Sequence, residues 1–596
     1  MPDSRIATVA DSLRESISSQ PGDFDYVEQF AGLVATAVHS VHGFRLHDVQ
    51  IRALAEGRSN TILEMQTGEG KTVVTGALAA IQSLQAESVH VSTTNTYLAA
   101  RDLEDMEPVF ELLGLSSSLL PEEPNESASR RAYRKQIVYG PGYQFGFDYL
   151  RDQMHLRRDR PNRLGRLTSN RIQGKDPYRN LIQTSEFHTA IVDEADSVMI
   201  DEATTPLIIS LPTDDHHDPK PYVLAKAITD EFSEGDDYTV RMPGPNIIVS
   251  DAANDRGHAA IASERNLHLT RPWRMYLKNA LQARLKLQRD IDYVVVDGSV
   301  QIVDQYTGRI QPDRTWQAGL HQAVEAKEGL VIQPGRESTA QITRQRFLQM
   351  YGQVIGLTGT AKSAIDEFRS AYSCGVNAIP TNRPCMRAML KTRFFAEQDS
   401  KFATIAADVK ARHNKGQPVL VGTKTIRESH QMRDVLQSQG LDPLVLNGVQ
   451  DEEEADIIAQ AGTFGAISIA TNMAGRGTDI KPDQKALAAG GLHVVGVSPN
   501  MSPRIDRQLA GRAARQGQPG SCQFFAAADD SVFVDNDSSL TKSIRRRASR
   551  SGESADFSRE LLNLQMSVEI RNRKQRESMM LRDRWMDTVR ESIEKE

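Results

Sequence analysis

The residues with the clearest chemistry form the sequence 65-MQTGEGKT-72, which lies between a short apolar stretch and a segment compatible with a helix. Gly68 and Gly70 let the backbone wrap around phosphate, so that its N–H groups point at the oxygens. Lys71 would neutralise the β- and γ-phosphates of a nucleotide, and Thr72 would bind Mg²⁺. The order strand, loop, GKT and helix predicts a phosphate-binding loop.

A second motif supplies carboxylates that could bind the same metal. The sequence 191-IVDEAD-196 begins with two apolar residues, which place Asp193 at the carboxyl end of a predicted strand. Open α/β sheets bind their ligands at that edge. Asp193 would hold Mg²⁺ through water, and Glu194 would orient and polarise the attacking water. An isolated DEAD tetrapeptide is weak evidence, but together with the phosphate loop it indicates nucleotide hydrolysis.

Phosphoryl transfer also needs positive charge at the γ-phosphate, and the second half of the chain offers it. Arg476 and Asp479 follow a predicted strand, and Arg512 and Arg515 lie three residues apart, which would put both on one face of a helix. The alternative is that these arginines only decorate a surface helix. Gln50, upstream of the phosphate loop, is a candidate to contact the adenine edge.

The elements that must position these residues are short, Val- and Ile-rich runs in two groups. Such runs, separated by amphipathic stretches, predict α/β architecture with parallel sheets covered by helices. The first group is 61–65, 88–94, 189–196 and 354–360, and the second is 418–423, 466–471 and 492–497. We therefore expect a nucleotide cleft between two sheet lobes, one with phosphate and metal ligands and one with arginines. Such a site converts hydrolysis into relative motion of the lobes.

A segment of different character interrupts the first group of strands before its last member. Residues 211–335 begin with a turn-rich boundary and contain two runs, 292–298 and 300–309, that predict a β-hairpin around Asp297-Gly298. The run that follows this region has the same character as the strands before it. The pattern predicts a separate domain inserted into the first lobe.

The end of the chain reads as a polar connection followed by a long helix. The arginine run Arg545, Arg546, Arg547 and Arg550 lies in the polar region 529–556, which we interpret as a solvated linker. From residue 557 onward there is no Pro or Gly, and forty helical residues would span about 60 Å. The residues expected on its packed face are Phe557, Leu561, Leu564 and Val568, then Met579, Met586, Val589 and Ile593 after a charged middle.

The composition of the chain excludes several classes of protein. The chain has 596 residues, of which 39% are hydrophobic and 25% charged, so we expect several folded domains. Its net charge of −7 gives no global basic field for nucleic acid. Three cysteines make neither a disulfide framework nor a metal motif. No long apolar run or secretory signal is present, so an intracellular, soluble protein is expected.

Longer motifs resemble one family. The stretch 193-DEADSVMIDEATTPLIIS-210 is similar to the SecA preprotein translocase ATPases far beyond its first four letters. The other stretches that carry the resemblance are 144-QFGFDYLRD-152, 301-QIVDQYTGR-309, 320-LHQAVEAKEGL-330, 380-PTNRP-384 and 470-ATNMAGRGTDI-480. The resemblance runs from about residue 25 to residue 596.

The resemblance implies a fold of two RecA-like parallel-sheet motor lobes, an inserted preprotein-binding domain and a long C-terminal helix. The implied divisions are 1–210 and 336–380 for nucleotide-binding lobe 1, 211–335 for the inserted preprotein cross-linking domain, 381–536 for nucleotide-binding lobe 2 and 537–596 for a truncated helical scaffold.

The resemblance also assigns roles to matching positions. The motif 358-TGT-360 would couple hydrolysis to lobe movement. The implied catalytic residues are Glu194, Asp193, Arg512 and Arg515; the ATP-binding residues are Gln50, Gly68, Glu69, Gly70, Lys71, Thr72, Arg476 and Asp479; and the Mg²⁺ ligands are Thr72 and Asp193. ATP and Mg²⁺ are the expected cofactors, and no zinc is expected because the cysteine-rich tail of the family is absent.

The expected partners are the SecYEG channel, unfolded preproteins and anionic membrane lipids. Full-length SecA and a second copy of this chain are left open as partners, and no nucleic acid is expected. The expected location is the cytoplasm and the cytoplasmic face of the cell membrane.

Several departures from the family pattern leave alternatives open. Ala195 stands where the family usually has Val, Ala510 replaces a usual Arg, and a segment rich in arginine lies within 155–179. The chain also stops within the scaffold helix, without the helical wing and the two-helix finger. The first reading is an ATP-driven translocase motor. The alternatives are a preprotein-binding or regulatory ATPase without independent translocation, and a nucleic-acid helicase, against which the net charge and the 6% aromatic content stand.

Overall fold

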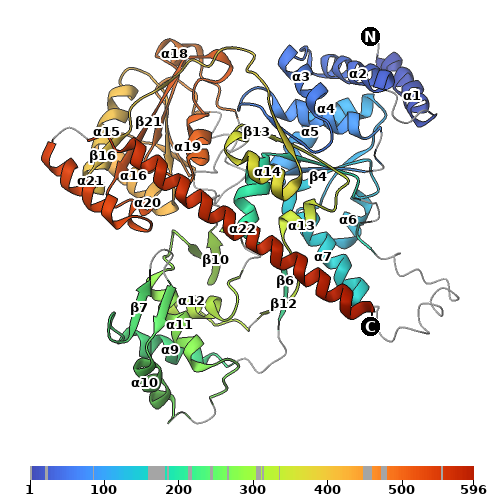
Figure 1. Ribbon diagram of the computed structural model, residues 1–596. Helices are drawn as coiled ribbons and strands as arrows, with labels where there is room; N and C mark the ends of the chain where they lie inside the picture. Colours follow the sequence, from blue (N-terminus) through green and yellow to red (C-terminus); the bar gives the residue numbers. More distant parts are fainter. Residues whose placement is uncertain are drawn as a thin grey trace.

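The computed structural model describes residues 3–19, 24–84, 86, 88–158, 181–183, 187–212, 218–241, 246–262, 264, 267–303, 310–311, 315–334, 336–446, 460–471, 479–551 and 555–595. Two sheet lobes lie side by side, a third unit hangs below them, and one long helix crosses the front of the molecule (Figure 1). None of the helices in these ranges is long and apolar enough to cross a membrane.

Lobe 1 is built on a parallel sheet of order β14-β1-β13-β5-β2-β4-β3. Its strands are β1 Thr61–Glu64, β2 Val89–Thr93, β3 Ser117–Leu119, β4 Ile137–Pro141, β5 Thr189–Asp193, β13 Gln353–Thr358 and β14 Gly375–Ala378. Its helices include α1 Asp3–Ser19, α2 Phe24–His42, α3 Asp48–Glu56, α4 Lys71–Gln82, α5 Thr96–Leu112, α6 Glu126–Ala132, α7 Gly142–Arg158, α13 Arg344–Leu348 and α14 Ile365–Tyr372. Both faces of the sheet are covered, since Ile191 of β5 packs in one core and Val192 in the other.

The insert leaves and rejoins lobe 1 through one antiparallel strand pair, β6 Leu207–Pro212 with β12 Arg336–Ile342. It contains α9 Lys220–Asp230, β7 Tyr238–Arg241, β8 Asn246–Val249, α10 Asp251–Ile261, α11 Trp273–Leu285, β9 Tyr293–Val296, β10 Ser299–Val303, β11 Ile310–Gln311 and α12 Leu320–Glu328. The predicted hairpin is confirmed: β9 and β10 are antiparallel, and Asp297 and Gly298 have φ of 49° and 73°. Two positive φ values are typical of a type I′ turn.

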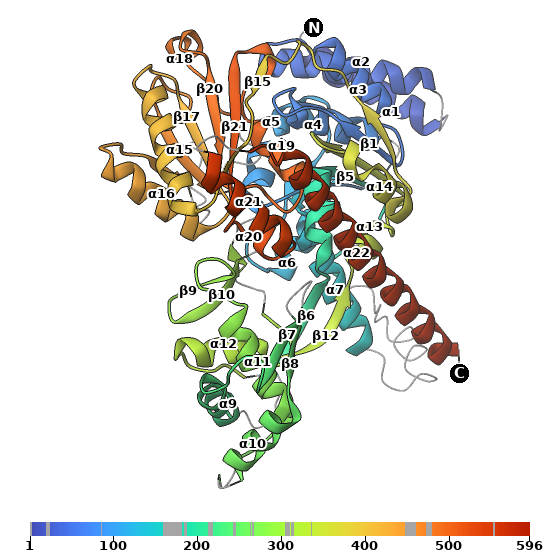
Figure 2. The same cartoon turned by 60° about the vertical axis from the view of Figure 1, so that its left-hand side comes forward.

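Lobe 2 contains a second parallel sheet, in the order β15-β21-β20-β17-β19-β18 with β16 also on β21 (Figure 2). Its strands are β15 Arg387–Met389, β16 Arg393–Phe395, β17 Val419–Thr423, β18 Leu444–Leu446, β19 Ile467–Thr471, β20 Leu492–Gly496 and β21 Gly520–Ala527. Its helices include α15 Gln398–His413, α16 Ile426–Ser438, α18 Gln484–Ala488 and α19 Pro503–Ala510. All seven strands that the sequence predicts are confirmed, within one to three residues at each end.

The polar region that follows lobe 2 is helical, so the linker interpretation was wrong. It forms α20 Ser531–Val534 and α21 Ser538–Ser551. Leu540 and Ile544 of α21 are buried in one cluster with Phe394 of β16 and Phe533 of α20. This spacing of four residues gave an apolar stripe that the arginine run concealed.

The long helix α22, Ser558–Lys595, has the predicted packed face only in its first half. Phe557, at its start, and Leu561, Leu564 and Val568 are buried, as expected. Beyond Val568, the described side chains that are buried are those of Arg576 and Met580, whereas Met579, Met586 and Val589 are half-buried. The Arg576 guanidinium donates to Glu367 of α14 at 2.6 and 2.8 Å, and this buried pair fixes which side of the helix faces lobe 1. The side chain of Ile593 lies outside the described part.

Candidate nucleotide site between the two lobes

A pocket of about 410 Å³ lies where the two lobes meet, within the size range of small-molecule sites. Lobe 1 and the linker to lobe 2 contribute Phe44, His47, Gln50, Thr67, Gly68, Glu69, Gly70, Lys71, Thr72, Val73, Asp193, Glu194, Asn382 and Arg383, and lobe 2 contributes Asp479, Arg515 and Gln516. Nearly all of the sequence-predicted site residues that the structure describes therefore come together. Arg476 lies outside the described residues, and Arg512 does not line the pocket.

The phosphate loop between β1 and α4 is tightly enclosed. Gly68 and Gly70 have φ of 92° and 81°, values that residues with a side chain rarely adopt. A Cβ on Gly70 would lie 2.3 Å from Nε2 of Gln50, and one on Gly68 would lie 3.1 Å from Cβ of Arg515. The glycines therefore permit both the turn and the approach of a lobe 2 side chain. The loop ends at the amino end of α4, where free N–H groups favour an anion.

Lys71 and Glu194 form a buried ion pair in this pocket. Lys71 Nζ lies 2.8 Å from Glu194 Oε1, and the two side chains are only 8% and 9% exposed. Burial by itself lowers the pKa of Lys71, but the carboxylates of Glu194 and Asp193 outweigh it and raise that pKa. Lys71, the cation predicted to bind phosphate, is therefore paired with Glu194, the carboxylate predicted to orient water.

Asp193 ends β5, as the sequence predicts. The Glu194 backbone N–H donates to Asp193 Oδ1 at 2.9 Å, and Glu194 itself has a φ of 53°, which turns the chain sharply after the strand. Burial, and then the neighbouring Glu194 charge, raise the pKa of Asp193 to about 7. A buried carboxylate with this cost of ionisation is the kind of group that a metal cation stabilises.

Thr72 lines the pocket, and its hydroxyl lies 3.5 Å from Asp102 Oδ1 of α5. Asp102 is buried and pairs with Arg101, and burial raises its pKa. Sequence reasoning missed Asp102, because nothing in the local pattern of α5 separates it from an ordinary helix carboxylate.

Of the two arginines Arg512 and Arg515, Arg515 is the one that reaches the pocket. Its Nη1 donates to Asp479 Oδ1 at 2.6 Å, and its side chain is 4% exposed. The prediction that Arg512 and Arg515 share a helix face was wrong: α19 ends at Ala510, and Ala514 and Gln516 have positive φ. These turns direct Arg515 into the pocket and leave Arg512 outside its lining.

The region expected to contact adenine is held by backbone contacts. Gln50 Nε2 donates to the Glu69 carbonyl at 3.0 Å, and Gln50 Oε1 accepts from the His47 N–H at 2.9 Å. Sequence reasoning assigned no site role to five residues that line the pocket beside Gln50 or across from it: Phe44, His47, Asn382, Arg383 and Gln516. The Asn382 N–H donates to Glu69 Oε2 at 3.0 Å, and the PTNRP motif was the signal that could have placed it.

A buried cluster behind the pocket joins the last residue of the DEAD motif to lobe 2. Asp196 accepts hydrogen bonds from Thr360 in lobe 1 and from Gln508 on α19. Arg504, also on α19, lies 3.3 Å from Asp196 and 2.8 Å from Asp201. Arg504 was not predicted, because its partners are some 300 residues away in sequence. Thr360 belongs to the motif 358–360, whose coupling role stays a prediction.

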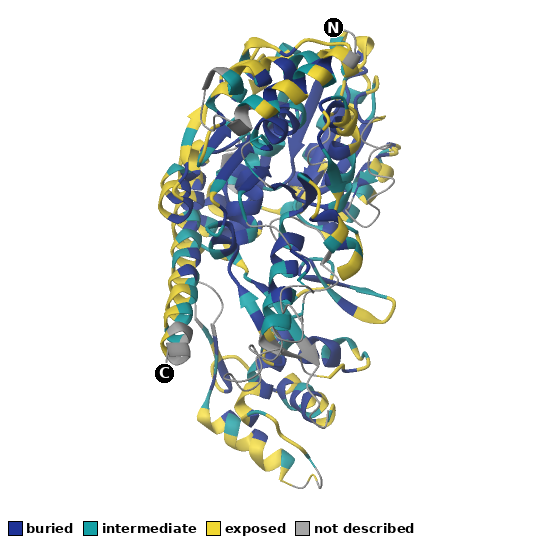
Figure 3. Ribbon diagram, turned by 90° about the vertical axis from the view of Figure 1, so that its right-hand side faces the viewer, coloured by how far each residue is buried: buried dark blue, intermediate teal, exposed yellow. Residues whose placement is uncertain are grey.

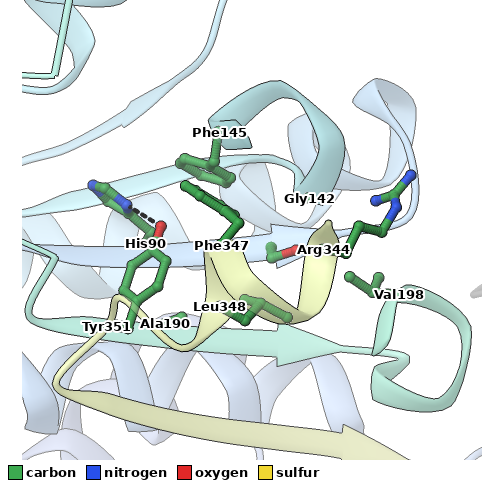
Figure 4. A pocket seen from close by; sticks show the side chains of 10 residues that line it. His90, Gly142, Phe145, Ala190, Val198, Arg344, Phe347, Leu348 and Tyr351 are labelled. Carbon is green, nitrogen blue, oxygen red and sulfur yellow. Dashed lines mark hydrogen bonds between the residues drawn. The ribbon is translucent and has the colours of Figure 1, made fainter. Parts of the chain in front are cut away.

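Figure 4 shows a second, much smaller hollow of about 10 Å³ in lobe 1, under α13. His90 Nδ1 lies 2.8 Å from the Tyr351 hydroxyl there, and burial lowers the pKa of His90 to about 3. A space of this size holds one water molecule at most, so it is no site for a ligand.

Comparison with known proteins places the chain in one family. The family model of the SecA DEAD-like domain matches residues 1–369, and that of the SecA P-loop domain matches 384–486 and 481–551. A protein translocase subunit SecA from a Nitratiruptor species is 38% identical over 89% of this chain and 59% of its own length. A subunit of the same name from Oleidesulfovibrio alaskensis is 36% identical over the whole chain and 67% of its own length.

The chain therefore spans about three fifths to two thirds of the length of these relatives. Among solved structures, S. cerevisiae Dbp5 bound to RNA and ADP BeF3 aligns over 90% of this chain and 97% of its own, at 12% identity and a TM-score of 0.41. A likeness at this level says nothing about function. On the two family models and the identity to these relatives, the chain belongs to the SecA family.

Proposed function

We propose that the interlobe pocket binds ATP with Mg²⁺ and hydrolyses it. The observation that carries the proposal is the arrangement of Lys71, Glu194, Asp193 and Arg515 around one pocket, with groups from both lobes. Residues Gly68–Thr72 would cradle the phosphates, and Thr72 and Asp193 would hold the metal. When bound there, Mg²⁺ would supply positive charge beside the phosphates and would lower the pKa of Asp193.

The Lys71–Glu194 pair would exchange partners when the nucleotide enters. Lys71 turns to phosphate, which frees the Glu194 carboxylate to orient the attacking water and take its proton. Arg515 would neutralise charge that develops on the γ-phosphate, and Asp479 holds the guanidinium in place at 2.6 Å. Because Arg515 comes from lobe 2, hydrolysis is complete only when the lobes are together.

We further propose that this ATPase is the motor subunit of a Sec protein translocase, moving unfolded preproteins through the SecYEG channel. Residues 1–210 with 336–380 would be lobe 1, 211–335 the preprotein-binding insert, 381–536 lobe 2 and 537–596 the scaffold. The insert is joined to lobe 1 by β6, which begins fourteen residues after the end of β5 at Asp193. A change at the metal site would thus reach the insert along a short, buried segment.

The insert also touches lobe 2, which gives it a second link to the nucleotide. Val294 and Val303 of the hairpin pack against Ile426 at the start of α16. Arg427 donates to the Arg289 carbonyl at 2.7 Å and to Gln288 Oε1 at 3.1 Å. Lobe movement would therefore move the insert relative to both lobes, as a clamp on an extended polypeptide requires.

The test is ATP hydrolysis and transport by the full chain. ATPase activity should rise with SecYEG vesicles and an unfolded secretory polypeptide, and not with RNA. Labelled preprotein should become protected inside the vesicles. Stimulation without protection would support a preprotein-binding or regulatory ATPase instead, and stimulation by RNA alone would contradict the proposal.

A second test addresses the polypeptide itself. Photo-reactive side chains at exposed positions of Tyr293–Val303 should cross-link to the unfolded polypeptide, with different yields in ADP and in a non-hydrolysable ATP analogue. The same label on α18, remote from the insert, is the control. Absence of cross-links in both nucleotide states would remove the clamp. Three further expectations stay predictions: that the chain forms a homodimer, that it binds full-length SecA, and that it lies at the cytoplasmic face of the membrane.

A further inference from the structure

The segment that carries Arg515 is a turn with an unfavourable backbone conformation. Ala514, Gln516 and Gly517 have φ of 55°, 54° and 71°. A positive φ costs free energy for any residue with a Cβ, and alanine has no polar side chain that could offset the cost with a local hydrogen bond. The turn therefore depends on contacts from other parts of the chain. We call residues 513–517 the arginine turn.

One such contact comes from the edge strand of the lobe 2 sheet. Arg387 is the first residue of β15, and its Nε donates to the Ala513 carbonyl at 3.0 Å. The register partner of Arg387 on β21 is Gly520, and a Cβ on Gly520 would lie 2.6 Å from the Ala514 nitrogen. Figure 2 shows β15 beside β21. This pair of strands therefore lies directly against the arginine turn.

The hydrogen bond from Arg387 reaches a buried part of the turn. Ala513 and Ala514 are 0% and 7% exposed, whereas Arg387 is half-buried. The interior that such buried residues form is dark blue in Figure 3. A charged donor makes a stronger hydrogen bond than a neutral one, and taking a donor away from a buried carbonyl costs free energy. The bond can therefore hold the turn against the strain of its backbone.

The segment that leads into β15 also contacts the phosphate loop. The Asn382 N–H donates to Glu69 Oε2 at 3.0 Å. A Cβ on Gly517 would lie 2.8 Å from Cβ of Arg383, so the stem of Arg383 packs on the end of the arginine turn. This one segment therefore touches both the loop that would bind phosphate and the turn that carries the arginine.

We propose that Arg387 is a positioning residue for ATP hydrolysis, because it holds the arginine turn in the conformation that directs Arg515 into the nucleotide pocket. Arg387 does not itself line that pocket, so its effect passes through Arg515. A displacement of about 1 Å at a reacting centre can cost about 10²-fold in rate. The inference rests on the proposed hydrolysis site and adds to it a residue that never touches the nucleotide.

Two replacements of similar length isolate the hydrogen bond. Glutamine carries Nε2 on the same Cβ–Cγ–Cδ stem as Nε of arginine, whereas methionine has a stem of similar length without a donor. Arg387→Met should slow ATP hydrolysis about 10²-fold, with the affinity for a fluorescent ATP analogue unchanged. Arg387→Gln should hydrolyse ATP at close to the wild-type rate. Arg393→Met, at an exposed arginine of β16, which also pairs with β21, is the matched control and should behave like wild type.

Two further backgrounds separate positioning from a general structural role. In Arg515→Ala, the change Arg387→Met should slow hydrolysis no further, because the side chain through which it acts is gone. In Ala514→Gly, the turn is free of strain at that residue, because glycine adopts positive φ readily. Arg387→Met should then cause a smaller loss than it causes alone. A residue that only stabilised lobe 2 would cause the same loss in all three backgrounds.

Hydrogen exchange of the amides of residues 511–518, without nucleotide, tests the hold on the turn directly. Exchange should quicken in Arg387→Met and stay unchanged in Arg387→Gln and Arg393→Met. If the wild type hydrolyses no ATP, the proposed function fails, and this measurement still decides whether Arg387 holds the turn. Because Arg387 is half-buried, these variants should fold. Arg387→Ala is the second variant without a donor, in case Arg387→Met does not.

Three results would overturn the inference. Equal exchange of residues 511–518 in Arg387→Met and wild type would mean that other contacts hold the turn. An unchanged rate of hydrolysis in Arg387→Met would mean that the hydrogen bond does not affect the chemistry. A full further loss from Arg387→Met in the Arg515→Ala background would mean that Arg387 acts by a route other than Arg515.

Discussion

Arg504 in lobe 2 forms a bidentate ion pair with Asp201 in lobe 1, and neither side chain is more than 5% exposed. The same guanidinium reaches Asp196 of the DEAD motif at 3.3 Å. One buried cation thus links the nucleotide site, the segment that leads to the insert and the helix that precedes Arg515.

Removing that cation should separate the lobes. Arg504→Ala leaves the buried carboxylates of Asp196 and Asp201 without this cation, which costs about 3–5 kcal/mol in buried pairs of this kind. Energy transfer between dyes on α6 and α16 should fall in a Cys385→Ser background. Asp201→Ala should do the same, and the double variant should show little further change. Arg507→Ala, an exposed arginine on the same helix, is the control. Unchanged transfer in Arg504→Ala would mean that other contacts hold the lobes.

Glu194→Gln should bind ATP at least as tightly as wild type and lose most of its turnover. The amide cannot take a proton from water, and Lys71 is then free of a competing carboxylate. Binding of a fluorescent ATP analogue and steady-state phosphate release measure the two effects. Turnover close to wild type would show that another group acts as the base.

Arg515→Ala should slow hydrolysis about 10³-fold or more with little change in ATP affinity, because the charge acts in the transition state. Because Arg512 does not line the pocket, it cannot replace the missing charge. Arg512→Ala should cost less than tenfold. Equal losses in the two variants would contradict this assignment.

Asp193→Asn should stabilise the nucleotide-free protein at pH 8. The folded-state pKa of about 7 exceeds the ordinary value of 3.8, so ionisation costs more in the folded state. The cost is absent below pH 4 and grows as pH rises to 7, up to about 4 kcal/mol. The gain in melting temperature should be larger at pH 8 than at pH 5. When Mg²⁺ and ATP are bound to the wild type, the difference in melting temperature between variant and wild type should become smaller. A larger gain at pH 5 would reverse the sign and reject the raised pKa.

Ile426→Ser should release the insert from lobe 2. The hydroxyl would be buried among Val294 and Val303 without a partner, which favours separation. Hydrogen exchange should then quicken in β9, β10 and the first turn of α16. Leu444→Ser, a change at an exposed residue of β18, should leave these amides unaffected. If β9 and β10 keep their protection, the contact with lobe 2 does not hold the hairpin.

The local structure around the site could be predicted from the sequence. Short apolar runs predict the parallel strands because both faces of such strands are buried. The glycines of 65–72 and the acids after β5 predict a phosphate loop and a carboxyl-end metal site, since each depends on residues close together in the chain. The hairpin at Asp297-Gly298 is likewise a local turn preference.

The tertiary structure alone decided which distant side chains meet. Arg504 pairs with Asp201 across some 300 residues, and no local pattern records that contact. Arg512 and Arg515 were expected together, but the end of α19 at Ala510 and two positive φ values separate them. In α22, the buried ion pair between Arg576 and Glu367 decides which side of the helix packs against lobe 1, and the spacing of apolar residues does not. A buried guanidinium must be paired with a carboxylate, and the fold supplies that carboxylate on another helix. Helix periodicity ranks faces by hydrophobicity, and it contains no information about a partner on another element.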